Sequence, residues 1–197
     1  MQLLILYIII GYMFGSVPTA LILSKRKNID IRKHGSGNIG GTNTFRVLGK
    51  KAGILVTAID ILKGFIPTLI ILYFSGETNA VAAGIAASLG HSYSIFAGFK
   101  GGKSVATSAG VMIALNPLSI LLGIAVFALA LFLTKYVSLS SMLAAASVVI
   151  YILTMENSVL IKLTTIFLAG FVVFRHHSNI RRLIGGNENK AFQKKNK

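Results

Sequence analysis

Long apolar segments alternate with short polar ones along the whole chain. Seven apolar runs stand out: Leu3–Leu23, Ala52–Phe74, Ala80–Phe99, Val105–Leu115, Leu118–Leu133, Leu139–Met155 and Val159–Phe174. Several approach the roughly 20 residues with which a helix crosses about 30 Å of hydrocarbon. The pattern predicts an all-α, polytopic membrane bundle with seven transmembrane helices, forming a single integral-membrane domain over residues 1–197.

The boundary between the fourth and fifth runs decides the number of spans. Asn116-Pro117 separates them, and proline disfavours helix at the residue before it, so we expect a break there. One kinked helix over residues 105–133 is the alternative. With seven spans and the N-terminus outside, all of the 20 Lys and Arg residues except Lys63 and Lys162 fall on the cytoplasmic side. This agrees with the positive-inside rule and predicts a cytoplasmic C-terminus.

Composition narrows the possible functions. The chain has 20 Lys and Arg against 5 Asp and Glu, an excess that in a soluble protein would suggest nucleic acid. In a membrane protein, topology explains this excess of positive charge, so no nucleic-acid partner is expected. The same positive charge would also favour binding of an anionic ligand. The chain has no cysteine, and no histidine lies at ligand spacing from its scattered acidic residues, so no metal site is expected. Residues 185–197 are interpreted as a flexible basic tail near anionic headgroups.

The first polar segment that suggests chemistry is HGSGNIGGTN, residues 34–43, followed by Arg46. Glycines let backbone N–H groups approach an anion, short polar side chains add hydrogen bonds, and arginine offers a bidentate fork for phosphate. A flexible linker between two helices is the alternative. The candidate phosphate-binding residues are Ser36, Gly37, Asn38, Thr42 and Arg46.

The second such segment is Phe99-Lys-Gly-Gly-Lys103. It resembles a Walker A loop, but three residues instead of four separate Gly98 from Gly102, and the preceding strand is absent. Free N–H groups, a helix N-terminus and two ammonium groups still favour an anion there. A basic loop that only sets topology is the alternative. The candidate phosphate-binding residues are Lys100, Gly101, Gly102, Lys103 and Thr107.

Further ionisable residues lie within or beside the apolar runs. Asp60 and Lys63 are three residues apart, so they share a helix face and can pair, either beside a polar cavity or as a lock between helices. His91 could act as a base, a hydrogen-bond donor or a packing residue. A topology-setting cluster explains the arginines of Arg175-His-His-Ser-Asn179, but leaves His176 and Asn179 unexplained.

Taken together, these segments resemble the bacterial acyl-phosphate:glycerol-3-phosphate acyltransferases, the PlsY family. Five motifs occur in the family's order between residues 36 and 188. They are Ser36-Gly-Asn-x-Gly-x-Thr-Asn43, Asp60-x-x-Lys-Gly64, Gly90-His91, Phe99-Lys-Gly-Gly-Lys-x-Val-Ala-Thr107 and His176-x-x-Asn-Ile180. Two positions depart from the family pattern: Gly41, where alanine is usual, and Ser94, where proline commonly follows the Gly-His pair.

The resemblance implies transfer of a fatty acyl group from acyl phosphate to the 1-hydroxyl of glycerol-3-phosphate, giving lysophosphatidic acid and phosphate without a cofactor. Its implied partners are both substrates, membrane lipid and the enzyme that supplies acyl phosphate. The implied location is the bacterial plasma membrane, with the active site facing the cytoplasm. A membrane carrier or channel for organic phosphates is the alternative function, but its anion-holding groups should converge near mid-membrane.

Roles follow as expectations. Arg46, Lys100 and Lys103 hold phosphates, while Ser36, Asn43, His176 and Asn179 orient the donor and the reacting groups. His91 is the side-chain candidate for general base, and the donor's leaving phosphate is the other candidate. Asp60 and Lys63 support the site structurally. Direct attack by the glycerol hydroxyl is favoured because the chain lacks cysteine, and an acyl-serine intermediate remains open.

Overall fold

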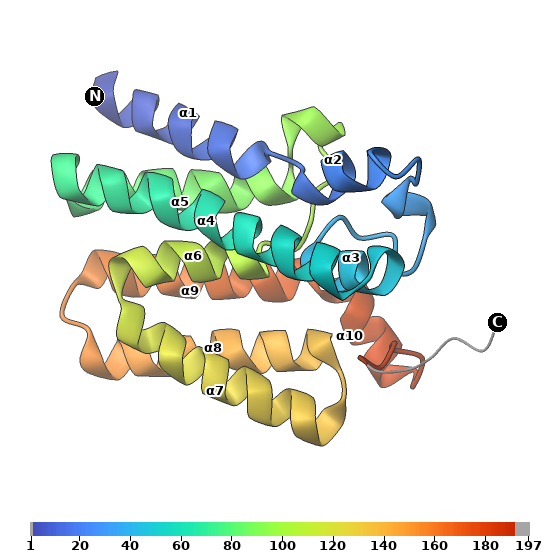
Figure 1. The fold of residues 1–197 in the computed structure, drawn as a ribbon. Coiled ribbons are helices and arrows are strands. Elements are labelled where there is room, and N and C mark those ends of the chain that lie inside the picture. Colours follow the sequence, from blue (N-terminus) through green and yellow to red (C-terminus); the bar gives the residue numbers. More distant parts are fainter. Residues whose placement is uncertain (1, 192–197) are drawn as a thin grey trace. The chain divides into compact units, whose positions relative to one another are not determined.

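The computed structural model describes residues 2–191, and every regular element in that range is helical (Figure 1). The chain divides into two compact units, the first ending at Leu115 and the second beginning at Asn116. The first unit contains α1 (Gln2–Ser16), α2 (Thr19–Lys25), η1 (Ile31–Lys33), α3 (Gly41–Leu48), α4 (Lys50–Ser75), α5 (Glu77–Ser92), η2 (Ile95–Ala97) and α6 (Val105–Leu115). The second contains α7 (Pro117–Thr134), α8 (Val137–Met155), α9 (Val159–Arg175) and α10 (His177–Ile184).

Most of the apolar runs form helices that can cross a bilayer. In the described part of the chain, five segments are long and apolar enough: Gln2–Lys25, Lys50–Ser75, Glu77–Ala97, Pro117–Thr134 and Val137–Met155. Helix α9 qualifies together with α10, from which it is bent by 56°, while α6 is apolar but only 11 residues long. The prediction of an all-α, polytopic membrane protein is therefore confirmed, and the count of seven spans stays a prediction.

Two prolines break the apolar runs. The predicted break at Asn116-Pro117 is confirmed: α6 ends at Leu115, and Asn116 Oδ1 caps α7 by accepting from the Ser119 N–H at 3.1 Å. The first apolar run was expected to be one helix, but it is broken at Val17-Pro18. Proline has no N–H to continue the helical ladder, which explains why α1 stops there and α2 starts anew.

Glycines bring the helices of the first unit very close together. A Cβ at Gly11 would lie 2.1 Å from the Ala83 carbonyl oxygen, and one at Gly15 would lie 2.0 Å from that of Ala87. These two glycines, four residues apart, seat α1 directly on the backbone of α5. Small residues at such spacing are typical of helix contacts in membranes, where close packing replaces the hydrophobic effect as the attraction.

One apolar cluster supports both polar loops of the first unit. Its buried members come from α2, η1, the segment before α3, α4 and η2; they are Ala20, Leu21, Ile31, Ile39, Val56 and Ala97. Ile39 belongs to the glycine-rich segment itself, and Ala97 lies just before the second glycine-rich loop. The two glycine-rich segments therefore pack on the same apolar core.

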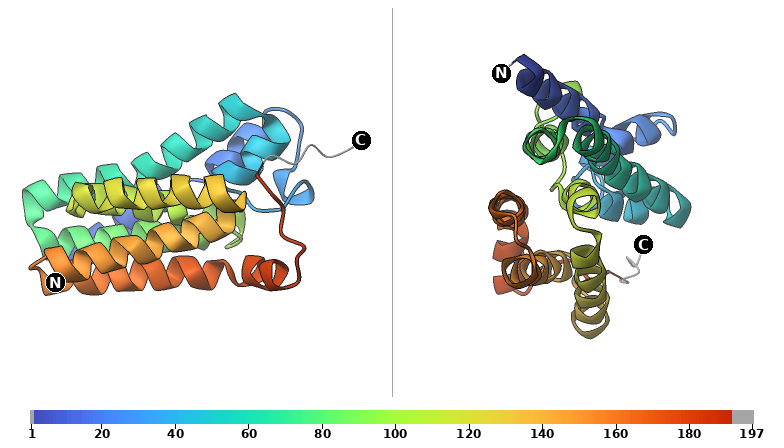
Figure 2. Two further views of the ribbon diagram at one scale, coloured as in Figure 1. Left: turned by 90° about the horizontal axis from the view of Figure 1, so that it is seen from below. Right: turned by 90° about the vertical axis from the view of Figure 1, so that its left-hand side faces the viewer.

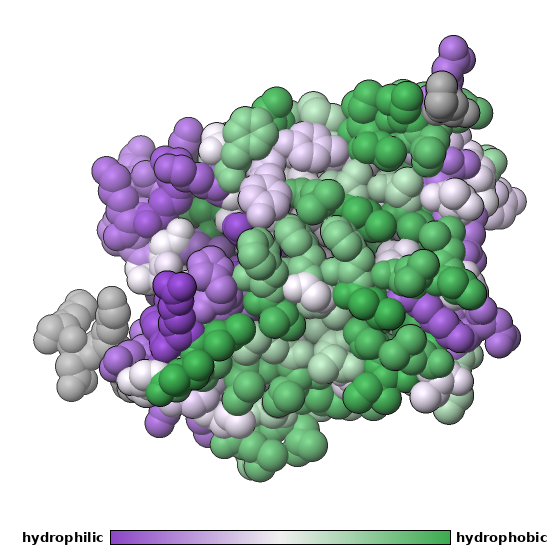
Figure 3. All heavy atoms as spheres, turned by 180° about the vertical axis from the view of Figure 1, so that it is seen from behind, coloured by the Kyte–Doolittle hydropathy of each residue, from purple (hydrophilic) through white to green (hydrophobic). Residues whose placement is uncertain are grey.

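The second unit is a helical hairpin extended by α9 and α10. Helix α7 packs on α8, and α8 packs on α9, as two further views show (Figure 2). Many large apolar side chains on the outer faces of these helices are exposed, among them Leu121, Phe132 and Ile150. Hydrophobic side chains dominate the middle of the surface drawn in Figure 3, as a lipid-facing surface requires.

The segment after α10 departs from expectation. Residues 185–191 were interpreted as the start of a flexible tail, but Glu188 is only 9% exposed and the Ala191 N–H donates to the Lys135 carbonyl at 2.8 Å. This part of the prediction is wrong because a buried carboxylate anchors the segment. Residues 192–197 of the expected tail lie outside the described residues.

Candidate active site

Asn43 shapes the first glycine-rich segment. Its Oδ1 accepts from the Ser36 N–H at 2.8 Å, while its Nδ2 donates to the carbonyl oxygens of His34 at 3.0 Å and Ile31 at 3.3 Å. The side chain is 1% exposed. Both amide hydrogens are therefore used within the loop, and Asn43 acts by folding residues 31–36 around itself. Ser36, by contrast, is exposed.

The turn that leads into this segment requires glycine. Gly35 has φ of +63°, and a Cβ there would lie 2.2 Å from Asn43 Oδ1. Gly37 also has a positive φ, of +72°. Glycine populates this region freely, so the chain can turn tightly under Ser36 and present it outward.

Helix α3 begins directly after this segment. Thr42 and Arg46 lie on α3 and are exposed, and Asn38, just before the helix, is half-buried. Gly41 starts the helix, and a Cβ there would lie 2.0 Å from Thr57 Oγ1, which donates to the Gly53 carbonyl. The glycine at this departure from the family pattern thus makes room for a threonine on α4.

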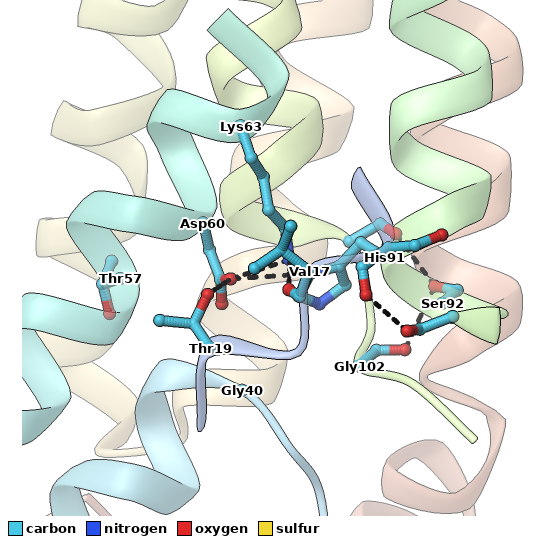
Figure 4. A network of polar contacts seen from close by, with 12 residues as sticks. Val17, Thr19, Gly40, Thr57, Asp60, Lys63, His91, Ser92 and Gly102 are labelled. Carbon is cyan, nitrogen blue, oxygen red and sulfur yellow. Dashed lines mark hydrogen bonds and ion pairs between the residues drawn. The ribbon is translucent and has the colours of Figure 1, made fainter. Parts of the chain in front are cut away.

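A buried polar network occupies the middle of the first unit (Figure 4). Lys63 Nζ and Asp60 Oδ1 on α4 are 2.9 Å apart, which confirms the predicted pairing. Lys63 also donates to the Val17 carbonyl at 3.0 Å, and Thr19 Oγ1 donates to Asp60 at 3.4 Å. Lys63 therefore binds the chain before the break at Pro18, and Asp60 binds the chain after it.

His91 lies in the last turn of α5, on the other side of Asp60. Its Nδ1 is 3.7 Å from Asp60 Oδ1, and the residue is 6% exposed. A Cβ at Gly102 would lie 2.1 Å from His91 Nε2. The imidazole is thus held between the carboxylate of α4 and the backbone of the second glycine-rich loop.

The paired glycines of that loop have a packing role that the sequence did not reveal. The Gly101 N–H donates to the Ser92 carbonyl and the Gly102 N–H to the His91 carbonyl, both at 3.0 Å. The expectation that these N–H groups are free for an anion is wrong, because they satisfy carbonyls at the end of α5. The cationic groups of this loop are those of Lys100, which is exposed, and Lys103, which is half-buried.

Two hydroxyls after this loop point into the protein. Ser104 Oγ donates to the Ser88 carbonyl at 2.5 Å and lies 2.8 Å from Ser92 Oγ, so it ties the start of α6 to α5. Thr107 is fully buried, and its backbone carbonyl packs against Gly64. The structure places Thr107 on the face of α6 that packs against α4.

The second unit holds the two remaining candidates, and one of them, Asn179, binds a buried acid. Glu188 accepts hydrogen bonds from Asn179 Nδ2 at 2.7 Å, Ser138 Oγ at 2.8 Å and Arg182 Nε at 2.7 Å. His176 is buried between α9 and α10, and its Nδ1 donates to the Val172 carbonyl at 2.7 Å. Burial alone would raise the pKa of Glu188, but these three hydrogen bonds outweigh it and hold the pKa below its ordinary value.

Sequence reasoning missed Glu188, and it missed how Asn43 acts. It grouped Ser36 with Asn43 and Asp60 with Lys63, and the structure brings both of these pairs together. Within the first unit, His91 and Gly102 join the second pair. His176 and Asn179 are described within the second unit.

Known proteins resemble this chain over nearly its whole length. A family model described as glycerol-3-phosphate acyltransferase matches residues 5–186. The chain belongs to the glycerol-3-phosphate acyltransferase family. It is 50% identical to a glycerol-3-phosphate acyltransferase of Bacillus cytotoxicus over 194 residues, covering 98% of both chains. It is 48% identical to glycerol-3-phosphate acyltransferase 2 of Bacillus anthracis, covering 94% of this chain and 98% of the relative.

Solved structures of the family agree with the fold. The crystal structure of PlsY, an integral membrane glycerol 3-phosphate acyltransferase, in its glycerol 3-phosphate form has a TM-score of 0.93 and 38% identity to this chain, with 96% of each chain covered. The lysophosphatidic acid form of PlsY gives a TM-score of 0.90 at 38% identity, covering 95% of this chain and 94% of PlsY.

Replacing Asn43 by aspartate should open the Ser36 turn of this acyltransferase. The substitution keeps the shape of the side chain but removes both hydrogen bonds to the Ile31 and His34 carbonyls and sets an oxygen against them. We expect turnover to fall at least about tenfold, the equivalent of one lost buried hydrogen bond. Initial rates of Asn43→Asp measure this, with Asn79→Asp on α5 as the matched control. Equal rates in both variants would contradict the role of Asn43.

Protonation of Glu188 should release the segment after α10. Because its pKa is depressed on folding, its contribution to stability is present above the ordinary value of 4.5 and is lost as pH falls through the folded pKa. Between pH 7 and pH 3, the thermal midpoint of the wild type should fall more than that of Glu188→Gln. Asp30, whose pKa Arg32 holds at about 2, titrates alike in both proteins. Parallel midpoints would show that Glu188 does not anchor the segment.

Proposed function

We propose that this protein transfers a fatty acyl group from acyl phosphate to the 1-hydroxyl of glycerol-3-phosphate, producing lysophosphatidic acid and inorganic phosphate. The observation that supports it best is the family match over residues 5–186, joined to full-length relatives named for the same acceptor. PlsY, whose structures are described in glycerol 3-phosphate and lysophosphatidic acid forms, supports the same acceptor and product. The acyl-phosphate donor is inferred from the motif resemblance.

The chemistry asks mainly for placement and charge stabilisation. The hydroxyl oxygen attacks the acyl carbon, the bond from that carbon to the phosphate oxygen breaks, and phosphate leaves with the electron pair. In this proposal Arg46, Lys100 and Lys103 hold the phosphates of the two substrates. Ser36, Gly37, Asn38 and Thr42 line the first polar segment, and Asn43 holds that segment in shape. His176 and Asn179, which belong to the second unit, are proposed from the motif resemblance to orient the donor and the reacting groups.

Placement of the proton follows from the surroundings of His91. The imidazole is 6% exposed and lies between Asp60 and Gly102, which leaves it little access to a glycerol hydroxyl. We therefore assign the proton to an oxygen of the donor's own phosphate and give His91 a supporting role. The leaving group then carries away the proton that the nucleophile loses, so no separate base is needed.

The protein is further proposed to act as one integral-membrane domain with seven spans. In this topology α6 is the short fourth span, the N-terminus is outside, and the C-terminus and the site face the cytoplasm of a bacterial plasma membrane. The Lys and Arg residues of the loops support this orientation. Membrane lipid and the enzyme that makes acyl phosphate are its proposed partners.

Donor choice can be tested with the purified protein in lipid. Acyl phosphate, acyl-CoA and acyl-carrier protein are each supplied with and without glycerol-3-phosphate, and phosphate and lysophosphatidic acid are measured. We expect both products from acyl phosphate only when glycerol-3-phosphate is present, and a raised KM for one substrate in Lys103→Gln. If acyl-CoA were the only donor that is turned over, the assignment of acyl phosphate as the donor would be wrong. Silence with every donor in folded protein would reject the enzyme and make phosphate uptake into liposomes the next assay.

The role of His91 is tested by His91→Gln. If the donor phosphate takes the proton, kcat should stay within about tenfold of wild type, since loss of a sole general base costs about 10²–10⁴-fold. The change is read from kcat at saturating concentrations of both substrates. A kcat that falls to the rate measured without enzyme would make His91 the base.

A further inference from the structure

A charged pair lies deep inside α4, a helix long enough to span the membrane. Asp60 is 2% and Lys63 is 6% exposed. Taking two charges out of water is costly, and a pair of apolar residues often stabilises a fold as well as a buried pair does. What these two residues hold is therefore more informative than the attraction between them.

On one side the pair holds the break at Pro18. Lys63 Nζ donates to the Val17 carbonyl at 3.0 Å, and Asp60 accepts from Thr19 Oγ1 at 3.4 Å. Lys63 thus binds the residue before the proline, and Asp60 binds the residue after it. The end of α1 and the start of α2 are fixed to α4 at this point.

On the other side the pair meets His91, and His91 meets the second glycine-rich loop. The Asp60 carboxylate is 3.7 Å from His91 Nδ1, on the opposite edge of the ring from Nε2 and Gly102. The Gly102 N–H is bonded to the His91 carbonyl, and Ser92 Oγ donates to the Gly102 carbonyl at 3.1 Å. With no room for a Cβ at Gly102, the loop follows the position of the ring closely.

We propose that Asp60 and Lys63 are positioning residues for acyl transfer. They fix His91 against the fixed point at Pro18, and His91 in turn sets the backbone path from Gly101 to Lys103. The pair thereby determines where the Lys103 ammonium stands. This inference rests on the proposed function, in which Lys103 holds a substrate phosphate.

A helix lock would have a different signature. If the pair only joined α4 to α2 and α5, losing it would lower the amount of folded enzyme or kcat, with no preference between substrates. A positioning pair acts through the loop, so its loss should weaken the same substrate whose KM depends on Lys103. The two effects should also fail to add, because both remove the same contact with phosphate.

The test is a double-mutant cycle. One arm combines Asp60→Asn with Lys63→Met, so that no unpaired charge is left, and the other arm is Lys103→Gln. KM for both substrates, kcat and the thermal midpoint are measured for wild type, each arm and the combination. We expect the pair variant to raise the KM that Lys103→Gln raises, by at least about fivefold, and the combination to be no more than about twofold worse than Lys103→Gln alone. Thr68→Val, a buried polar change elsewhere on α4, should leave both KM values unchanged.

Each outcome decides the matter. Effects that multiply, or a loss of kcat with both KM values unchanged, would overturn the positioning role. Should the neutral pair variant not fold, Asp60→Glu keeps the charge and lengthens the side chain toward its neighbours. It should produce the same selective rise in KM, and an unchanged KM would overturn the proposal. Absence of turnover in the wild type overturns the proposed function and this inference together, whereas multiplying effects in an active enzyme overturn only the inference.

Discussion

Inside a bilayer no water can satisfy a polar backbone group, so every carbonyl freed by a helix break needs a partner from the chain itself. The break at Pro18 illustrates this constraint. The carbonyl of Val17 is bonded by Lys63, and that of Ser16 accepts from Ser94 Oγ. Lys63 cannot lie there as an isolated charge, and Asp60 neutralises it. A single proline in the first apolar run thus accounts for a buried ion pair on α4.

The need to satisfy backbone carbonyls at a helix end also explains the second glycine-rich loop. Helix α5 ends at Ser92, and the last carbonyls of a helix have no partners within it. The Gly101 and Gly102 N–H groups supply two of them, which requires the loop to run against the end of α5 without side chains in between. The glycines here let the loop backbone approach the end of α5, and the positive charge of the loop comes from its lysines.

Ser94 shows how a departure from the family pattern can be accommodated. A proline at this position would have no hydroxyl, whereas Ser94 Oγ binds the end of α1 across 78 residues of sequence. At Gly41 the missing methyl is matched by Thr57, which occupies the space beside it. Both departures therefore correspond to specific contacts in this chain.

Sequence alone predicted the features that depend on short spacing. The Asp60–Lys63 pairing follows from three residues on one helix face, and the break at Asn116 follows from a proline between two apolar runs. The equivalent signal at Pro18 was overridden by the length of the run around it. Asn43 was assigned to substrate because its loop partners depend on a backbone path that no periodicity reveals. Glu188 was not singled out, because Ser138, one of its partners, lies 50 residues away.

The contact between α1 and α5 has a consequence for how the protein is made. Gly11 and Gly15 form a strip without side chains that packs on the backbone at Ala83 and Ala87. During synthesis α1 enters the membrane first, and its partner follows only after the intervening α4 has been inserted. Until then this strip faces lipid or whichever helix is nearest. The contact between α1 and α5 therefore forms only after α5 has entered the membrane, through small residues that are typical of helix contacts there.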